Sequence, residues 1–105
     1  MKQFLAALLV LVSLAGMAQK GADKGSVKGF IYDKVNGEGI PFANVQVQGT
    51  DFGAATDEQG FFFIPNLPSG SYKIIVNYIG YEQQILDVEV KKNQTANLKV
   101  FISTK

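Results

Sequence analysis

The residues that could perform chemistry in this 105-residue chain are carboxylates, hydroxyls and lysines, because the sequence contains no histidine, cysteine, tryptophan or arginine. Without imidazole or thiol groups, the chain lacks the usual ligands of zinc, copper and iron–sulfur clusters. It also lacks the commonest general base and the thiolate nucleophile. We therefore predict that the protein is not an enzyme and that it has no catalytic residues, no cofactor and no metal site.

Two groups of acidic residues are the remaining candidates for a site. Asp51, Asp57 and Glu58 could offer oxygen atoms to calcium, but their spacing differs from that of a calcium-binding loop, and calcium needs six to eight oxygens. We interpret them as residues of an Asp-capped turn. Asp33 and Glu38 could form the acid/base pair of a glycoside hydrolase, but nothing in the sequence predicts a cleft around them. We expect both to be solvated at the turn that contains Asn-Gly.

The four tyrosines could form a platform on which sugars stack, because each ring has a broad face and a polar tip. Tyr72 and Tyr78 share an alternation pattern with aliphatic residues, which favours the core for both. Tyr81 follows Gly80, and we expect its hydroxyl to bond to backbone across a turn, as in a tyrosine corner. Tyr32 is the fourth tyrosine.

The segment from Lys91 to Thr95 carries two further weak signals. Asn93-Gln94-Thr95 matches a glycosylation acceptor, a short pattern that matters only in a host with that machinery. Lys91 and Lys92 are too few for a basic patch and are typical of a solvated turn. The other lysines are scattered, which argues against binding to nucleic acid.

The N-terminus has the layout of a secretory signal peptide. Lys2 precedes an apolar run from Phe4 to Leu14, and small residues follow. Cleavage after Ala18 is the favoured site, which assigns residues 1–18 to the signal peptide, and cleavage after Ala15 is the alternative. An uncleaved membrane anchor is the other interpretation, although the run is short for a span of about 20 residues. Removal of the signal peptide would leave a formally neutral chain, exported to the periplasm or outer membrane or secreted.

Residues 19–25 are polar and glycine-rich, which predicts a flexible linker. Order should begin near Ser26, and residues 26–103 should form one domain. Here the apolar residues recur every second position, between turn signals about ten residues apart, which indicates an all-β sandwich. In the first strand, Val27 and Ile31 share one face and Phe30 and Tyr32 the other, and the pattern does not decide which face is buried. In the later strands, the positions expected to face the core are Val45, Val47, Tyr72, Ile74, Val76, Tyr78, Leu86, Val88, Val90, Ala96, Leu98, Val100 and Ile102. The opposite face of these strands should carry Gln46, Gln48, Asp87, Glu89, Asn97 and Lys99.

The stretch "TDEQGFFFIPNLPSG" departs from this alternation. Its first residues predict a type I turn that Gly60 closes. The run Phe61–Ile64 is continuously apolar, which is typical of a strand covered on both sides. Pro65 and Pro68 should end the strand and confine it to a loop or an edge. One face of the run, either Phe61 with Phe63 or Phe62 with Ile64, could contact a partner domain.

The ordered set of "VKGFIYD", "GIPFANVQVQGT", "TDEQGFF" and "LPSGSYKIIVNYIGY" resembles the carboxypeptidase regulatory-like domain over about residues 26–102. The resemblance implies a seven-stranded, antiparallel, transthyretin-like β-sandwich. Similar domains follow the signal peptide of SusC-type, TonB-dependent outer-membrane receptors, and others accompany metallocarboxypeptidases, adhesins and carbohydrate-active enzymes.

By this resemblance, we expect a non-catalytic accessory domain that docks onto the plug or barrel of such a receptor or onto another periplasmic protein. No plug or barrel sequence follows within the 105 residues. The chain is then either part of a larger nutrient receptor or a free-standing secreted module that binds carbohydrate or mediates adhesion, with a glycan as its partner.

Overall fold

The computed structural model describes residues 23–105, which contain seven β-strands. They are β1 (Lys24–Asp33), β2 (Asn44–Val47), β3 (Gly53–Ala55), β4 (Phe61–Pro68), β5 (Gly70–Asn77), β6 (Gln84–Val90) and β7 (Thr95–Ile102). The signal peptide and the first part of the predicted linker lie outside the described residues. Within residues 23–105, no helix is long and apolar enough to cross a membrane.

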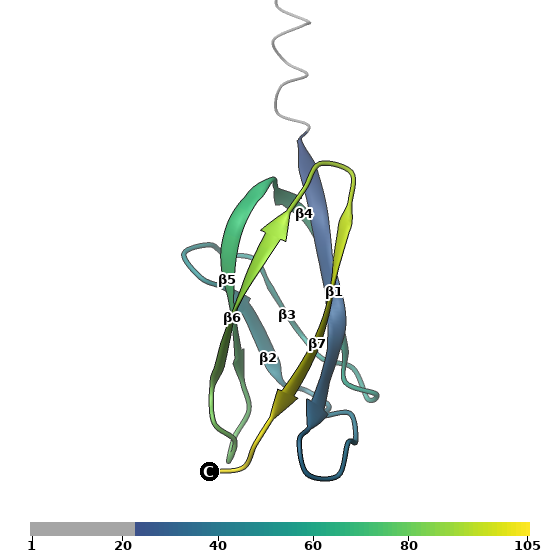
Figure 1. The fold of residues 1–105 in the computed structure, drawn as a ribbon, viewed down its shortest axis with the longest axis vertical. Helices are drawn as coiled ribbons and strands as arrows, with labels where there is room; N and C mark the ends of the chain where they lie inside the picture. The colour runs from purple at the N-terminus through teal and green to yellow at the C-terminus, as the bar shows by residue number, and fades with distance from the viewer. Residues whose placement is uncertain (1–22) are drawn as a thin grey trace, which may run out of the picture.

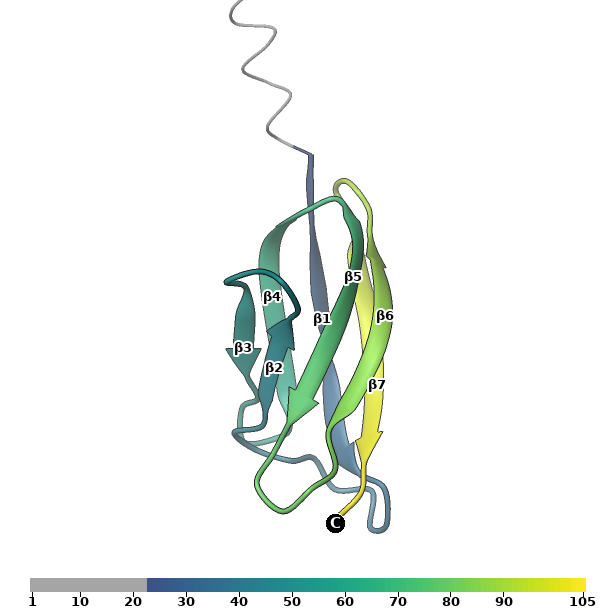
Figure 2. The same ribbon diagram turned by 90° about the vertical axis from the view of Figure 1, so that its left-hand side faces the viewer.

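The strands form two sheets that pack face to face, which confirms the predicted all-β sandwich (Figures 1 and 2). One sheet has the order β4-β1-β7, and the other has the order β3-β2-β5-β6. Four of the five strand pairings are antiparallel, and the pairing of β1 with β7 is parallel. The sandwich is therefore not antiparallel throughout, because the last strand returns beside the first in the same direction.

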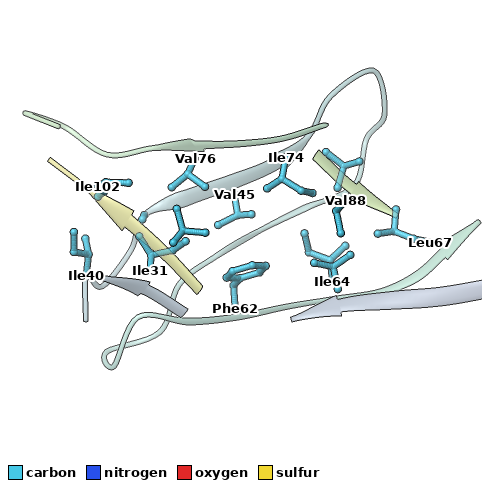
Figure 3. Close-up of a cluster of buried hydrophobic side chains, with 14 of the residues drawn as sticks. Ile31, Ile40, Val45, Phe62, Ile64, Leu67, Ile74, Val76, Val88 and Ile102 are labelled. Atoms are coloured by element: carbon cyan, nitrogen blue, oxygen red, sulfur yellow. The ribbon is translucent and has the colours of Figure 1, made fainter. Parts of the chain in front are cut away.

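The core lies between the two sheets, where apolar side chains from both inner faces meet (Figure 3). It forms because alternate residues of a strand point to the same face, so each strand contributes every second side chain. All the positions predicted to face the core are buried or packed against it. The buried apolar residues are Val27, Ile31, Ile40, Ala43, Val45, Val47, Phe62, Ile64, Leu67, Ile74, Val76, Val88, Val90, Val100 and Ile102.

Strand β1 begins at Lys24, two residues before the start of order expected at Ser26. Lys24 and Gly25 pair with residues at the end of β4, so this part of the expected linker belongs to the sheet. The glycine suits the position, because a Cβ atom at Gly25 would lie 2.4 Å from the carbonyl oxygen of Lys91. The polar composition of residues 19–25 predicts a linker. The pairing of Lys24 and Gly25 depends on contact with the distant strand β4, which local composition does not report.

Strand β4 corrects two expectations. It continues through Pro65 to Pro68 instead of ending there, because it is an edge strand and a proline without an N–H breaks no pairing on the open side. A β-bulge at Pro65–Asn66, with Asn66 at φ 61°, accommodates the ring. The run is also not covered on both sides within the described residues, because Phe62 is buried whereas Phe63 is 47% exposed.

The turn before β4 forms as predicted. Gly60 donates its N–H to the carbonyl oxygen of Asp57 at 3.0 Å, and it has φ 87°, which favours glycine. The Asp57 carboxylate accepts hydrogen bonds from the N–H groups of Gln59 and Phe61, both at 2.9 Å. The turn thereby places Phe61 at the start of β4.

Candidate functional site

The outer side of the three-stranded sheet carries five aromatic side chains, which we call the aromatic face; four of them are linked by ring contacts. Its members are Phe30, Tyr32, Phe61, Phe63 and Phe101. Phe30 pairs across the strands with Phe61, and Tyr32 pairs with Phe101. The ring centroids are 5.2 Å apart for Phe30 and Phe61, 5.8 Å for Phe30 and Tyr32, and 5.4 Å for Tyr32 and Phe101. The contacts therefore cross all three strands.

The aromatic face is basic. Lys28 and Lys99 are exposed on the same side of the sheet, and the Lys99 ammonium lies 5.8 Å from the centre of the Tyr32 ring, a cation–π distance. Within β1, β4 and β7 the one acidic residue is Asp33, whose side chain is buried. This face therefore combines exposed apolar rings with unneutralised positive charge.

A hollow of about 420 Å³ lies in the middle of the aromatic face. The rings of Phe30 and Phe61 form one part of its lining, and Lys28, Asn97 and Lys99 contribute to the rest. An apolar side chain of a partner could insert beside the rings while the lysines contact carboxylates around it. Buried aromatic pockets surrounded by polar groups are the usual centre of protein–protein interfaces.

Three rings of the aromatic face, those of Phe30, Tyr32 and Phe101, are poorly placed to bind sugars. Phe30 and Tyr32 are nearly parallel, with an interplanar angle of 13°, and Tyr32 and Phe101 are stacked at 30°. Neighbouring rings therefore cover parts of each other's faces, whereas a stacked sugar needs a free ring face. The arrangement favours contact with protein side chains.

A second concave region, the end pocket, lies at the end of the four-stranded sheet near the C-terminus. Its volume is about 770 Å³. The pocket is lined by the β1–β2 loop, the first residue of β2, the last residue of β5, the β5–β6 loop and the C-terminal residue. The lining residues are Phe42, Asn44, Asn77, Tyr78, Ile79, Gly80, Tyr81, Gln83 and Lys105. The β5–β6 loop and the C-terminus meet at this end of the molecule (Figures 1 and 2).

A hydrogen bond between side chains fixes one wall of the end pocket. The Tyr81 hydroxyl donates to Asp33 Oδ2 at 2.5 Å, and Asp33 Oδ1 accepts the N–H groups of Val35 and Asn36. The hydrogen bond from Tyr81 and those from the two amides hold the pKa of Asp33 below its ordinary value. The same bond to Asp33 raises the pKa of Tyr81. Tyr81 thus bonds a side chain rather than the backbone expected of a corner tyrosine.

The structure does not bring the acidic candidates of the sequence together within residues 23–105. Residues 23–105 contain no group of three acidic side chains that could hold a metal ion. Asp57 caps its turn as expected, and Asp51 and Glu58 are exposed. Asp33 is committed to the loop amides and to Tyr81, whereas Glu38 is exposed at the turn. The expectation of a solvated Asp33 is therefore wrong, because the residue is 8% exposed and its carboxylate is hydrogen-bonded within the protein.

The four tyrosines are divided between the two regions and do not form one platform. Tyr32 belongs to the aromatic face, and Tyr78 and Tyr81 form an aromatic pair at the end pocket with centroids 5.5 Å apart. Tyr72 packs against the core, as predicted, and its hydroxyl donates to the carbonyl oxygen of Pro68. Tyr78 also packs against the core while one part of it lines the pocket.

The weak signals near the β6–β7 turn have structural explanations. Asn93 adopts φ 58° and donates its N–H to the carbonyl oxygen of Lys24. Lys92 lies 3.3 Å from Asp23, and Lys91 lies 3.9 Å from Glu89. The two lysines therefore serve local ion pairs.

Sequence reasoning missed several residues of both regions. For Phe101 a signal exists, because the period of two that places Val100 and Ile102 in the core also turns Phe101 outward. No pattern in the sequence marks Asn44 and Asn77 as part of a site. For Phe42, an aromatic residue directly after Pro41 in a loop was the available signal.

The fold defines a β-sandwich domain without a recognisable catalytic constellation among its described residues. The model of the CarboxypepD_reg-like domain family matches residues 27–105, and the chain belongs to that family. No curated protein sequence matches the chain.

Several solved structures share the fold. The TIE protein of Bacillus anthracis is 25% identical with a TM-score of 0.66, and the match covers 78% of this chain and 17% of that protein. A chain of a type II cohesin–X-dockerin complex from Acetivibrio cellulolyticus is 18% identical with a TM-score of 0.65, over 76% of this chain and 58% of that one. The major pilin subunit of Bacillus cereus is 20% identical with a TM-score of 0.61, over 78% and 30%. In each case, the match spans less than two thirds of the solved chain.

Proposed function

We propose that this chain is a non-catalytic docking domain and that the aromatic face is its docking surface. The observation that carries the proposal is a group of aromatic side chains on a β-sheet face that the described residues leave uncovered. Phe30, Phe63 and Phe101 are 37%, 47% and 45% exposed. Exposed apolar patches rimmed by polar residues mark interaction sites in soluble proteins.

The charge of the aromatic face suggests the chemistry of its partner. Lys28 and Lys99 flank the hollow and have no carboxylate partner within residues 23–105. A complementary surface would present a protruding apolar side chain surrounded by aspartate or glutamate. In our proposal this surface belongs to a protein, namely the plug or barrel of a TonB-dependent outer-membrane receptor or another periplasmic protein. Membership of the family and the signal-like N-terminus support this setting.

Docking by addition of a strand along β4 is disfavoured. Pro65 and Pro68 remove two N–H donors, and the bulge at Asn66 interrupts the edge. Prolines and bulges at sheet edges are common means by which proteins prevent pairing with another strand. This observation favours side-chain contacts on the aromatic face over backbone pairing at β4.

Site-specific photocrosslinking tests the proposal. A photoreactive phenylalanine analogue would replace Phe63 in the full chain, and the same analogue at Ile85 would serve as control, because Ile85 is 54% exposed on the other sheet. After irradiation in a periplasmic and outer-membrane extract, we expect a receptor or periplasmic protein to be crosslinked from position 63 alone. Substituting Lys28 and Lys99 together by Glu should abolish the crosslink. Equal crosslinking from both positions, or none from position 63, would contradict the proposal.

A further inference from the structure

The end pocket differs chemically from the aromatic face and lies on the other sheet. Asn44 and Asn77 are directly opposite each other on β2 and β5, and Gln83 lies next to them in the lining. All three are exposed, and within residues 23–105 none of their side-chain amides makes a hydrogen bond. Three free carboxamides therefore meet at one concave site. Each carboxamide offers both donors and an acceptor.

The apolar part of the end pocket comes from loops. Phe42 is 69% exposed, and Ile79, at the turn between β5 and β6, is 94% exposed. The pair Tyr78 and Tyr81 supplies further aromatic surface. Unlike Phe30, Tyr32 and Phe101, Phe42 is in none of the ring pairs found among the described residues, so no other aromatic ring stacks on it.

Phe42 is held in an unfavourable backbone conformation. Its φ is 60°, in the left-handed region that bulky residues rarely adopt. Thr56 fixes the loop on both sides of it. The Thr56 hydroxyl donates to the Ile40 carbonyl oxygen at 2.6 Å and accepts the Ala43 N–H at 2.8 Å, while the Thr56 carbonyl oxygen accepts the Phe42 N–H at 3.0 Å.

Burial of the ring does not offset the backbone strain at Phe42, because the side chain is mostly exposed to solvent. Backbone strain that the surrounding structure enforces is concentrated at functional sites, where it presents a side chain. The Phe42 loop is thus an observation independent of the carboxamides, and both concern the same concavity.

From these features we infer that the end pocket is a binding site for a neutral oligosaccharide. Its lining combines a free aromatic ring, on which the C–H face of a sugar can stack, with carboxamides that match hydroxyl groups as donors and acceptors. No carboxylate side chain lines the pocket among the described residues, and the charged side chain present is that of Lys105. Its volume of about 770 Å³ lies within the range of small-molecule sites, about 300–1,000 Å³.

Titration calorimetry with the purified full chain tests this site. The probes are the neutral trisaccharides cellotriose, maltotriose, mannotriose and xylotriose, together with trigalacturonic acid as an anionic comparison. We expect at least one neutral trisaccharide to bind with a Kd of about 1 mM or lower. Asn77→Ala should weaken that binding about tenfold or more, equivalent to about 1.4 kcal/mol. Gln48→Ala, at an exposed carboxamide that lines neither concave region, is the matched control and should bind as the unmodified chain does.

A second variant separates loss of binding from loss of folding. Phe42→Gly removes the ring and also relieves the strain at φ 60°, because glycine adopts this conformation freely. It should unfold at the same or a higher temperature than the unmodified chain and yet bind no trisaccharide.

Three results would overturn the inference: no binding of any neutral trisaccharide, binding that Phe42→Gly and Asn77→Ala leave unchanged, or tighter binding of trigalacturonic acid than of every neutral probe. The proposed docking function would survive each of these results, because Phe63 and the two lysines of the aromatic face are not in the end pocket.

Discussion

The outer faces of the two sheets differ although the same alternation of residues builds both. On the three-stranded sheet, outward positions carry aromatic rings and lysines without an acidic partner. On the four-stranded sheet they carry amides and charges of both signs, including an ion pair of 2.8 Å between Lys73 and Asp87. Ile85 is also exposed there, but none of the aromatic contacts among the described residues lies on that face. The second face has the composition of a surface that remains in water.

The comparison shows that exposure of the aromatic face is not a consequence of the fold. A sandwich of this kind tolerates polar residues on an outer face, as the four-stranded sheet demonstrates. The rings of the aromatic face also create a risk of aggregation. In the proposed function, a partner that covers these rings explains their retention.

The largest expected effect distinguishes the two sides of β4. Phe62→Ala should lower the free energy of unfolding by about 3–5 kcal/mol, because it leaves a cavity in the core. Phe63→Ala should lower it by about 1 kcal/mol, since that ring is already half exposed. Urea unfolding of both variants measures the difference. Equal losses would show that the aromatic face is structural, and the docking proposal would lose its basis.

The next effect concerns the loop that carries Phe42. Thr56→Val should lower the free energy of unfolding by about 1–3 kcal/mol, because it leaves the buried Ala43 N–H and the Ile40 carbonyl without a partner. Thr56→Ser keeps the hydroxyl and should cost about 1 kcal/mol or less. The two variants are compared by chemical denaturation. If Ser and Val were equally damaging, packing rather than hydrogen bonding would hold this loop.

Period-two alternation predicted the core positions of β2, β5, β6 and β7, because one buried face per strand dictates them, but it did not predict Ile40, Ala43 and Leu67. The sequence also predicted that one face of the Phe61–Ile64 run could contact a partner, but not which face is exposed. That choice depends on the register of β4 against β1, which pairs Phe30 with Phe61. Register is a tertiary property.

The end pocket was harder to predict than either sheet face. Nothing in the sequence distinguishes Asn44, Asn77 and Gln83 from other polar residues. They line one pocket only because β2 pairs with β5 and the β5–β6 loop folds beside them. Likewise, the contact of Tyr81 with Asp33 joins residues 48 positions apart, and no local pattern reports it. Loops that carry sites are positioned by distant contacts, so periodicity gives little information about them.

That contact predicts how stability depends on pH. Since the folded-state pKa of Asp33 is lowered, its contribution is complete above the unfolded value of about 3.9 and is lost as the pH falls through the lower, folded pKa. Since the pKa of Tyr81 is raised, its contribution is complete below about pH 10 and is lost as the pH rises through the folded value. Tyr81→Phe should therefore be less stable than the unmodified chain between these limits.

Urea unfolding of both proteins from pH 2.5 to pH 11 measures this difference. It should be largest near pH 7 and shrink towards both ends of the range. Asp51→Asn, at an exposed carboxylate that makes no ion pair within residues 23–105, is the control. A difference between Tyr81→Phe and the unmodified chain that stays constant down to pH 2.5 would mean that ring packing, and not the hydrogen bond to Asp33, accounts for it.

The smallest effect compares the pairwise contacts of the two faces. Lys73 and Asp87 have side chains that are 55% and 83% exposed, so a double-mutant cycle should give a coupling of about 0–1 kcal/mol. Salt at 1 M should abolish that coupling, because exposed charges are screened. The Tyr32–Phe101 pair should couple by about 0.5–1.5 kcal/mol and keep that value in salt, since ring contacts carry no net charge. Coupling of the ring pair that disappears in salt would show that Lys99, rather than ring stacking, organises the aromatic face.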